Sequence, residues 1–188
     1  MSHMEAEVVE DLINDLKNHF GELVMTRGKK HTFWGMNINI TEEKKVEIEM
    51  KKQLLESIEA FVEDPDEKLT TPAYSHLFIF NKQKKQLDEE KRKIFHLVVV
   101  KILYIMKRAR PDSETAILCL CRRVSKIDVD EWEKINRLML WVEETIDDKI
   151  IIGSNILTNV YTWVGADYVI DSNMRSHTGG GISMGLQS

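Results

Sequence analysis

The chain has 188 residues, 43% of them hydrophobic and 30% charged, which is enough to bury one sizeable core or two small ones. Its formal net charge of −5 argues against a protein that coats nucleic acid over its whole surface. No apolar run reaches the length of a transmembrane helix, and no signal peptide opens the chain. We therefore expect a soluble, intracellular protein, cytoplasmic or nuclear, with no membrane partner.

The N-terminal part predicts a helix, a small sheet and a second helix. Residues 6–21 carry an apolar stripe at helical spacing and stop at a glycine, which is typical of an amphipathic helix. That stripe consists of Val8, Leu12, Leu16 and Phe20. Three short runs with alternating apolar character then predict an antiparallel meander, at residues 22–26, 31–41 and 45–50. Residues 51–64 read as a helix that Pro65 ends.

Three helices are predicted in the middle of the chain. The longest, about 88–109, must stop before Pro111 because a residue that precedes proline is pushed out of the α region. Residues 112–126 restart as a helix, with Asp112 or Ser113 as N-cap and Glu114 in the first turn. Residues 128–147 form the third helix. Its expected buried face is Trp132, Ile135, Leu138 or Met139, and Val142.

After residue 148 the apolar period changes from 3.6 to 2, which indicates strands. The expected strands are residues 149–155, 157–165 and 180–185. So small a sheet, without a helix behind it, leaves an edge and a face uncovered. We therefore expect further segments beyond Ser188, or a partner that covers this edge.

Basic residues are concentrated in one window of this acidic chain. Between Lys82 and Lys126 there are thirteen Lys and Arg residues against five Asp and Glu residues. Mixed charges of this kind can solvate helix faces, or they can form a patch that binds phosphates. The candidate contacts are Lys101, Lys107, Arg108, Arg110, Arg122 and Arg123.

The stretch WVGADYVIDSNMRSHTGGG, residues 163–181, could be a metal site, a phosphate loop or a plain hairpin. It lacks the Lys-Ser/Thr ending of a phosphate loop and opens no predicted helix. Its glycines are more typical of a bulge or of closely approaching strands, and His177 is typical of a turn. Elsewhere, Cys119 and Cys121 are too close for an ordinary disulfide, and we expect both to be reduced.

Several segments together carry a resemblance to a known family. HTFWGMNI, Thr71-Pro72, YIMKRARPDSETA, WEKINRLMLWVEETIDD, WVGADY and RSHTGG follow one another along the chain. Their order and approximate spacing are similar to those in the polyproteins of copia-type LTR retrotransposons. The matching part is the end of the reverse transcriptase and the start of its RNase H domain, and it covers nearly the whole chain.

The resemblance implies three regions within an α+β fold. Residues 1–72 would be the end of the polymerase palm, with an N-terminal helix, a small meander and an adjoining helix. Residues 73–148 would be a helical region like a thumb or connection, and residues 149–188 the first strands of an incomplete RNase H-like sheet. Trp34 and Gly35 would form a hairpin on the primer side, where a small residue lets the backbone approach a primer strand.

The resemblance also implies that catalytic groups are missing. Polymerases of this family hold two Mg²⁺ ions with palm carboxylates, which would lie before Met1, so we expect no cofactor and no polymerase chemistry. Gly165 stands where the first RNase H carboxylate belongs. Asp167 lies two residues further on the same strand face, about 7 Å away, so a shifted carboxylate is the open alternative. We expect no catalytic and no metal-binding residues.

Two functions remain open from the sequence. The first is a truncated, inactive fragment of an RNA-directed DNA polymerase that still grips an RNA–DNA or DNA duplex through its basic helix. The second is a structural or protein-interaction module that binds no nucleic acid. In that case the basic helix would face acidic segments of its own chain or of a partner, such as the missing polymerase or RNase H segments.

Overall fold

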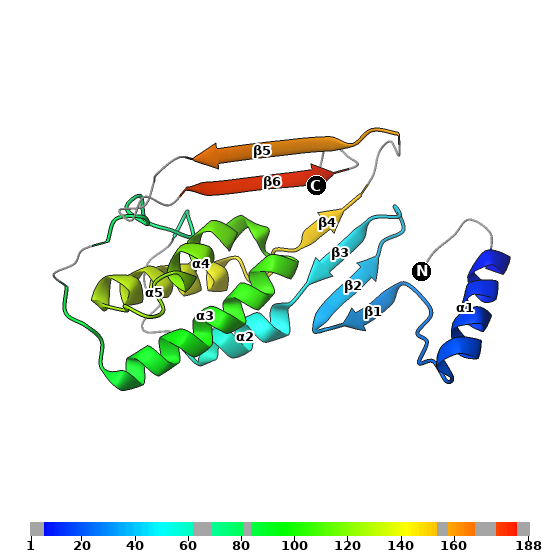
Figure 1. Ribbon diagram of the computed structural model, residues 1–188, viewed down its shortest axis with the longest axis horizontal. Helices are drawn as coiled ribbons and strands as arrows, with labels where there is room; N and C mark the ends of the chain where they lie inside the picture. Colours follow the sequence, from blue (N-terminus) through cyan, green and yellow to red (C-terminus); the bar gives the residue numbers. More distant parts are fainter. Residues whose placement is uncertain (1–5, 62–68, 81–83, 154–157, 168–175, 184–188) are drawn as a thin grey trace.

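The computed structural model describes residues 6–61, 69–80, 84–153, 158–167 and 176–183. Within these ranges the chain forms five α-helices, a short 3-10 helix and two antiparallel sheets, so the expected α+β class is confirmed. Helices α2 to α5 gather beside the larger sheet, while α1 stands apart beyond its other end (Figure 1). The elements are α1 (Ala6–Phe20), β1 (Lys30–Phe33), β2 (Met36–Ile40), β3 (Val46–Glu49), α2 (Lys51–Glu59), α3 (Glu89–Ala109), η1 (Pro111–Ser113), α4 (Glu114–Cys121), α5 (Val129–Glu144), β4 (Ile150–Ile152), β5 (Tyr161–Asp167) and β6 (His177–Ser183).

The larger sheet has the strand order β1-β2-β3-β4, with every pair antiparallel. Because successive side chains point to opposite faces, its register separates a polar face from an apolar face. The polar face carries Lys30, Thr32, Asn37, Asn39, Glu47 and Glu49. The apolar face carries His31, Phe33, Met36, Ile38, Ile40, Val46, Ile48, Ile150 and Ile152.

Two parts of the sheet differ from the sequence-based expectation. Residues 22–26 form no strand, and Val24 is fully exposed, so an alternating apolar pattern was not sufficient to place this segment in the sheet. Strand β4 does not begin a separate C-terminal sheet, because it pairs with β3 and places Ile150 opposite Ile48. The expected domain boundary between residues 148 and 149 would therefore place β4 in a different region from β3, the strand with which it pairs.

The buried core lies among the helices. Helix α3 begins at the N-cap Asp88, whose carboxylate accepts a 2.8 Å hydrogen bond from the backbone N–H of Lys91, and it ends before Pro111 as expected. The expected buried face of α5 is confirmed, including both Leu138 and Met139. The main buried side chains are Leu54, Phe95, Val98, Ile102, Met106, Ile117, Leu120, Ile135, Leu138, Met139 and Val142.

Strands β5 and β6 form a separate two-stranded ribbon above the helices (Figure 1). Its register places Gly165 opposite Gly179 and Trp163 opposite Gly181. The strand expected at residues 180–185 begins earlier, at His177, because the glycines pair along the whole of β5. None of the helices described is long and apolar enough to cross a membrane.

Candidate nucleic-acid interface

The exposed side of α3 carries an alternation of basic, aromatic and apolar residues. Leu97, Lys101, Tyr104 and Arg108 recur at helical spacing and form one stripe along the helix. Lys101 is exposed, Tyr104 is 38% exposed and Arg108 is half-buried. The guanidinium carbon of Arg108 lies 3.7 Å from the centroid of the Tyr104 ring, and Arg108 Nη1 donates a 3.0 Å hydrogen bond to the carbonyl of Tyr104. The ring therefore holds this cation in a fixed position at the surface.

The turn between β1 and β2 presents two aromatic rings. Trp34 and Gly35 occupy its two central positions with φ of 51° and 80°, the pattern of a type I′ hairpin turn. Phe33 and Trp34 are stacked, with centroids 5.5 Å apart and planes 10° apart, although they are 57% and 68% exposed. A Cβ at Gly35 would lie 2.7 Å from Gln53 Nε2 of α2. Gly35 thus serves the turn and the close approach of α2.

One hydrogen bond joins the hairpin to the basic helix. Tyr104 Oη donates to the carbonyl oxygen of Trp34 at 2.8 Å, across 70 residues of sequence. Two groups of residues that the sequence suggested independently, the Trp34-Gly35 hairpin and the cations of α3, therefore lie side by side. We call Phe33, Trp34, Lys101, Tyr104 and Arg108 the hairpin–α3 surface.

A shallow groove adjoins the hairpin–α3 surface. It lies between α2 and α3, has a volume of about 300 Å³ and is mostly apolar. Its lining consists of Gln53, Glu56, Ser57, Val100, Lys101, Tyr104 and Ile105. The surface thus offers a cation, an aromatic ring and an apolar hollow within about two turns of one helix.

The remaining predicted cations lie in other surroundings. Lys107 is exposed but points about 100° around α3 from Arg108, and its Nζ lies 3.6 Å from Glu114 Oε1. Arg122 is half-buried at the C-cap of α4. Arg123 donates to the buried Glu131 carboxylate at 2.9 Å and stacks over Phe80.

Arg110 is 2% exposed, which is incompatible with the surface phosphate contact expected from the sequence. Its guanidinium donates to the carboxylate of Asp112, and to the carbonyl and hydroxyl oxygens of Thr145 at 2.9 and 2.6 Å. It also stacks over Trp141, 4.8 Å from the ring centroid. Arg110 therefore fastens the end of α3 to the end of α5, and we exclude it from the interface.

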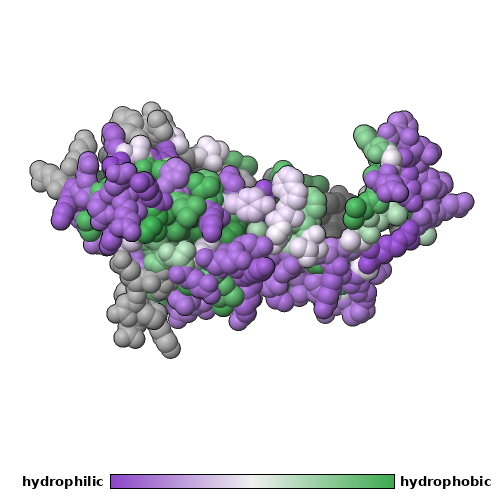
Figure 2. Space-filling view, turned by 90° about the horizontal axis from the view of Figure 1, so that it is seen from below, coloured by the Kyte–Doolittle hydropathy of each residue, from purple (hydrophilic) through white to green (hydrophobic). Residues whose placement is uncertain are grey.

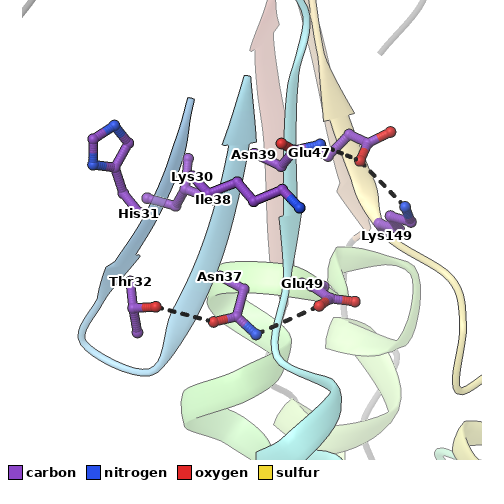
Figure 3. A pocket seen from close by; sticks show the side chains of 9 residues that line it. All are labelled: Lys30, His31, Thr32, Asn37, Ile38, Asn39, Glu47, Glu49 and Lys149. Atoms are coloured by element: carbon purple, nitrogen blue, oxygen red, sulfur yellow. Dashed lines mark hydrogen bonds and ion pairs between the residues drawn. The ribbon is translucent and has the colours of Figure 1, made fainter. Parts of the chain in front are cut away.

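The polar face of the larger sheet, together with His31, Ile38 and Lys149, lines a hollow of about 430 Å³ (Figure 3). Thr32 donates to Asn37 at 3.3 Å and Asn37 to Glu49 at 3.4 Å, so the side chains form a row across three strands. A second row consists of Asn39, Glu47 and Lys149. Hydrogen bonds from Asn39 and Lys149 hold the pKa of Glu47 below its ordinary value. Because cations and carboxylates alternate here, this face has no preference for a polyanion.

Three buried acids, Asp128, Asp130 and Glu131, lie close together near the start of α5. Each already has hydrogen-bond or ion-pair partners within the chain. Asp128 is the N-cap of α5, and its carboxylate accepts from the backbone N–H of Asp130 at 2.7 Å and from that of Glu131. The Glu131 carboxylate in turn accepts from the backbone N–H of Asp128 at 3.0 Å, which completes a capping box. Asp130 also contacts the ammonium groups of Lys134 and Lys84 at 2.8 and 3.1 Å. This cluster, which the sequence analysis missed although the spacing Asp-x-x-Glu indicates it, stabilises a helix start.

An open hollow of about 950 Å³ lies between the β5–β6 ribbon and α4. Gly165 lines it, and a Cβ at this position would meet no atom within 4 Å. The position therefore has room for a side chain, and glycine is not required there by crowding.

The residues that sequence reasoning missed are Phe33 and Tyr104. Tyr104 could have been found from its register, because it lies three residues after Lys101 and four before Arg108. No local sequence pattern predicts the hydrogen bond from Tyr104 to Trp34.

In comparisons with known proteins, no family model and no solved structure matches this chain.

Proposed function

We propose that this chain corresponds to part of a retrotransposon RNA-directed DNA polymerase and that it binds the backbone of an RNA–DNA duplex. The observation that carries the proposal is the bond from Tyr104 to Trp34, which unites the aromatic hairpin tip with the cations of α3. The family resemblance of the sequence supports the same reading, since it assigns the hairpin to the primer side.

The hairpin–α3 surface has the chemistry that a nucleic-acid backbone requires. Lys101 and Arg108 stand about two turns apart on one helix, so both can meet phosphates of one strand without base-specific contacts. The stacked rings of Phe33 and Trp34 offer a flat platform for an unpaired or terminal base. Lys107 adds a third cation at the margin, weakened by its contact with Glu114.

The proposal includes no catalytic step. Gly165 stands where the resemblance requires the first RNase H carboxylate, and the described carboxylate cluster at Asp128, Asp130 and Glu131 is held by the backbone and by three cationic side chains. The chain's own residues thus bind and orient a duplex, and a nuclease or polymerase reaction is not assigned to them.

The double variant Lys101→Ala/Arg108→Ala is expected to weaken binding of an RNA–DNA hybrid about tenfold at 100 mM salt, because two phosphate contacts are lost. Fluorescence anisotropy with a labelled hybrid measures the change. The matched control is Lys85→Ala/Lys126→Ala, which removes the same charge from exposed lysines near the other end of α3. An equal loss in both double variants would show that net charge, and not this surface, determines binding.

A further inference from the structure

Two hydrogen-bond acceptors line the groove between α2 and α3 without a donor to pair with. Glu56 is exposed, and its carboxylate makes no hydrogen bond or ion pair with any residue that the structure describes. Gln53 is half-buried, and its Oε1 atom is buried with no hydrogen-bond partner among those residues. An acceptor left unpaired in a buried position destabilises the folded state, and a ligand that donates to it removes that cost. The groove therefore favours a ligand that donates hydrogen bonds.

The other polar groups of the groove are either occupied or positively charged. The hydroxyl of Ser57 donates to the carbonyl of Gln53 at 2.8 Å. The hydroxyl of Tyr104 donates to the β1–β2 turn, as described above. Lys101 forms no ion pair with Glu56 or with any other residue in the described part of the chain. A free cation and a free carboxylate thus line the same groove.

The groove continues the hairpin–α3 surface, since Lys101 and Tyr104 belong to both. Between the polar groups its walls are apolar and include Val100, which is 54% exposed, and Ile105. Figure 2 is viewed from the side on which α2 and α3 lie, and hydrophobic areas reach the surface there among hydrophilic ones. A strand whose phosphates meet Lys101 and Arg108 therefore runs past the groove.

The two kinds of nucleic-acid backbone differ in whether they can donate hydrogen bonds. Phosphate and deoxyribose oxygens within a DNA strand are all acceptors, so they offer nothing to a carboxylate or an amide oxygen. Each ribose of RNA adds a 2′-hydroxyl, which donates as well as accepts. A surface that only held phosphates would need cations alone, and a carboxylate beside Lys101 repels phosphates. The unpaired acceptors of Glu56 and Gln53 therefore match an RNA strand and not a DNA strand.

We propose that the α2–α3 groove receives the RNA strand of the hybrid and distinguishes it from DNA by its 2′-hydroxyl groups. Lys101 contacts a phosphate of that strand, and the adjoining ribose hydroxyls donate to Glu56 and Gln53. Glu56 then determines specificity, because its charge opposes the phosphates while its oxygens accept from ribose. This inference rests on the proposed function, and it adds which strand of the duplex faces α3.

The test compares three duplexes of one sequence by fluorescence anisotropy at 100 mM salt. They are an RNA–DNA hybrid, a DNA duplex, and a hybrid whose RNA strand carries 2′-fluorine in place of every 2′-hydroxyl. The fluorinated strand keeps a sugar conformation close to that of RNA but has no donor at this position. The parent chain is expected to bind the natural hybrid about fivefold more tightly than either of the other duplexes.

Glu56→Ala is expected to bind the natural and the fluorinated hybrid almost equally, and to bind the DNA duplex more tightly than the parent because a negative charge is lost. The matched control is Glu59→Ala, which removes the same charge from an exposed residue of α2 that does not line the groove. This control should keep the fivefold preference. Gln53→Met keeps the length of the side chain without the acceptor, and it should reduce the preference about twofold.

The outcomes separate this inference from the proposed function. If none of the duplexes binds at 50 mM salt, the proposed function fails and this inference fails with it. If the duplexes bind through Lys101 and Arg108 but the parent does not distinguish the natural from the fluorinated hybrid, the strand assignment is wrong and the proposed function stands. A preference that survives Glu56→Ala unchanged would also overturn the assignment.

Discussion

Asp130→Asn is expected to lower the free energy of unfolding by about 3 kcal/mol, because it leaves the buried ammonium of Lys134 without its counter-charge. The side chains of Lys134 and Asp130 are 1% and 9% exposed, and their charged atoms lie 2.8 Å apart. Lys134 also donates to the carbonyl of Ile79 at 2.9 Å, so the pair joins the start of α5 to the segment before α3. For a chain of this size, such a loss lowers Tm by about 10 °C.

The effect of Asp130 is also expected to depend on pH. Burial raises the pKa of Asp130, but the hydrogen bonds and charges of Lys134 and Lys84 outweigh burial and hold it below the ordinary value of 3.8. A carboxyl whose pKa is lowered in the folded state adds stability above its unfolded pKa and loses that contribution as the pH falls through the folded pKa. The Tm difference between parent and variant should therefore be constant from pH 8 to pH 5 and shrink below about pH 4.

Glu133→Gln is the matched control for Asp130. Its carboxylate lies 3.6 Å from Lys84, but its side chain is 56% exposed, so its removal should cost less than about 1 kcal/mol. Thermal unfolding followed by circular dichroism measures both variants. Equal losses in the two variants would show that the Lys134–Asp130 pair is not the source of the stability.

Arg110→Lys is expected to lower the free energy of unfolding by about 2–3 kcal/mol although it keeps the charge. An ammonium cannot reproduce the fork that reaches Asp112 and both oxygens of Thr145, and it cannot stack as a plane over Trp141. The bonded oxygens would then be left without their donors in a buried position. Chemical denaturation measures the loss.

Hybrid binding by the Arg110→Lys variant tests whether Arg110 has a structural role or contacts phosphate. Binding of the hybrid at 15 °C, where the variant is still folded, is expected to equal that of the parent. Arg108→Lys is the control: it should change stability little, because Arg108 is half-buried at the surface, but it loses the planar contact with Tyr104. If the Arg110→Lys variant were as stable as the parent but bound the hybrid more weakly, Arg110 would have to be counted among the phosphate contacts.

Local patterns of the sequence were sufficient for most of the helices. The ends of α3 follow from Asp88 and Pro111, and the buried face of α5 follows from the spacing of Trp132, Ile135 and Val142. These features depend on interactions between residues that are close in sequence, so a local pattern is enough to predict them.

Long-range pairing could not be predicted in the same way. Strand β4 pairs with β3, about a hundred residues earlier, because both offer apolar residues to one face, and alternation alone does not say which edge a strand joins. Arg110 has the charge and position of a phosphate contact, but its partner Thr145 comes from another helix. Likewise, the position of Tyr104 against Trp34 exists only once the hairpin and α3 meet.

The salt dependence of hybrid binding tests the central proposal most directly. If Lys101, Lys107 and Arg108 contact phosphates, log K should fall with log salt at a slope of roughly −2.7, at about −0.9 for each contact. Affinity for the RNA–DNA hybrid should then drop about fortyfold between 50 and 200 mM salt. A flat profile, or no binding at 50 mM, would contradict the duplex-binding account and favour a protein-interaction module.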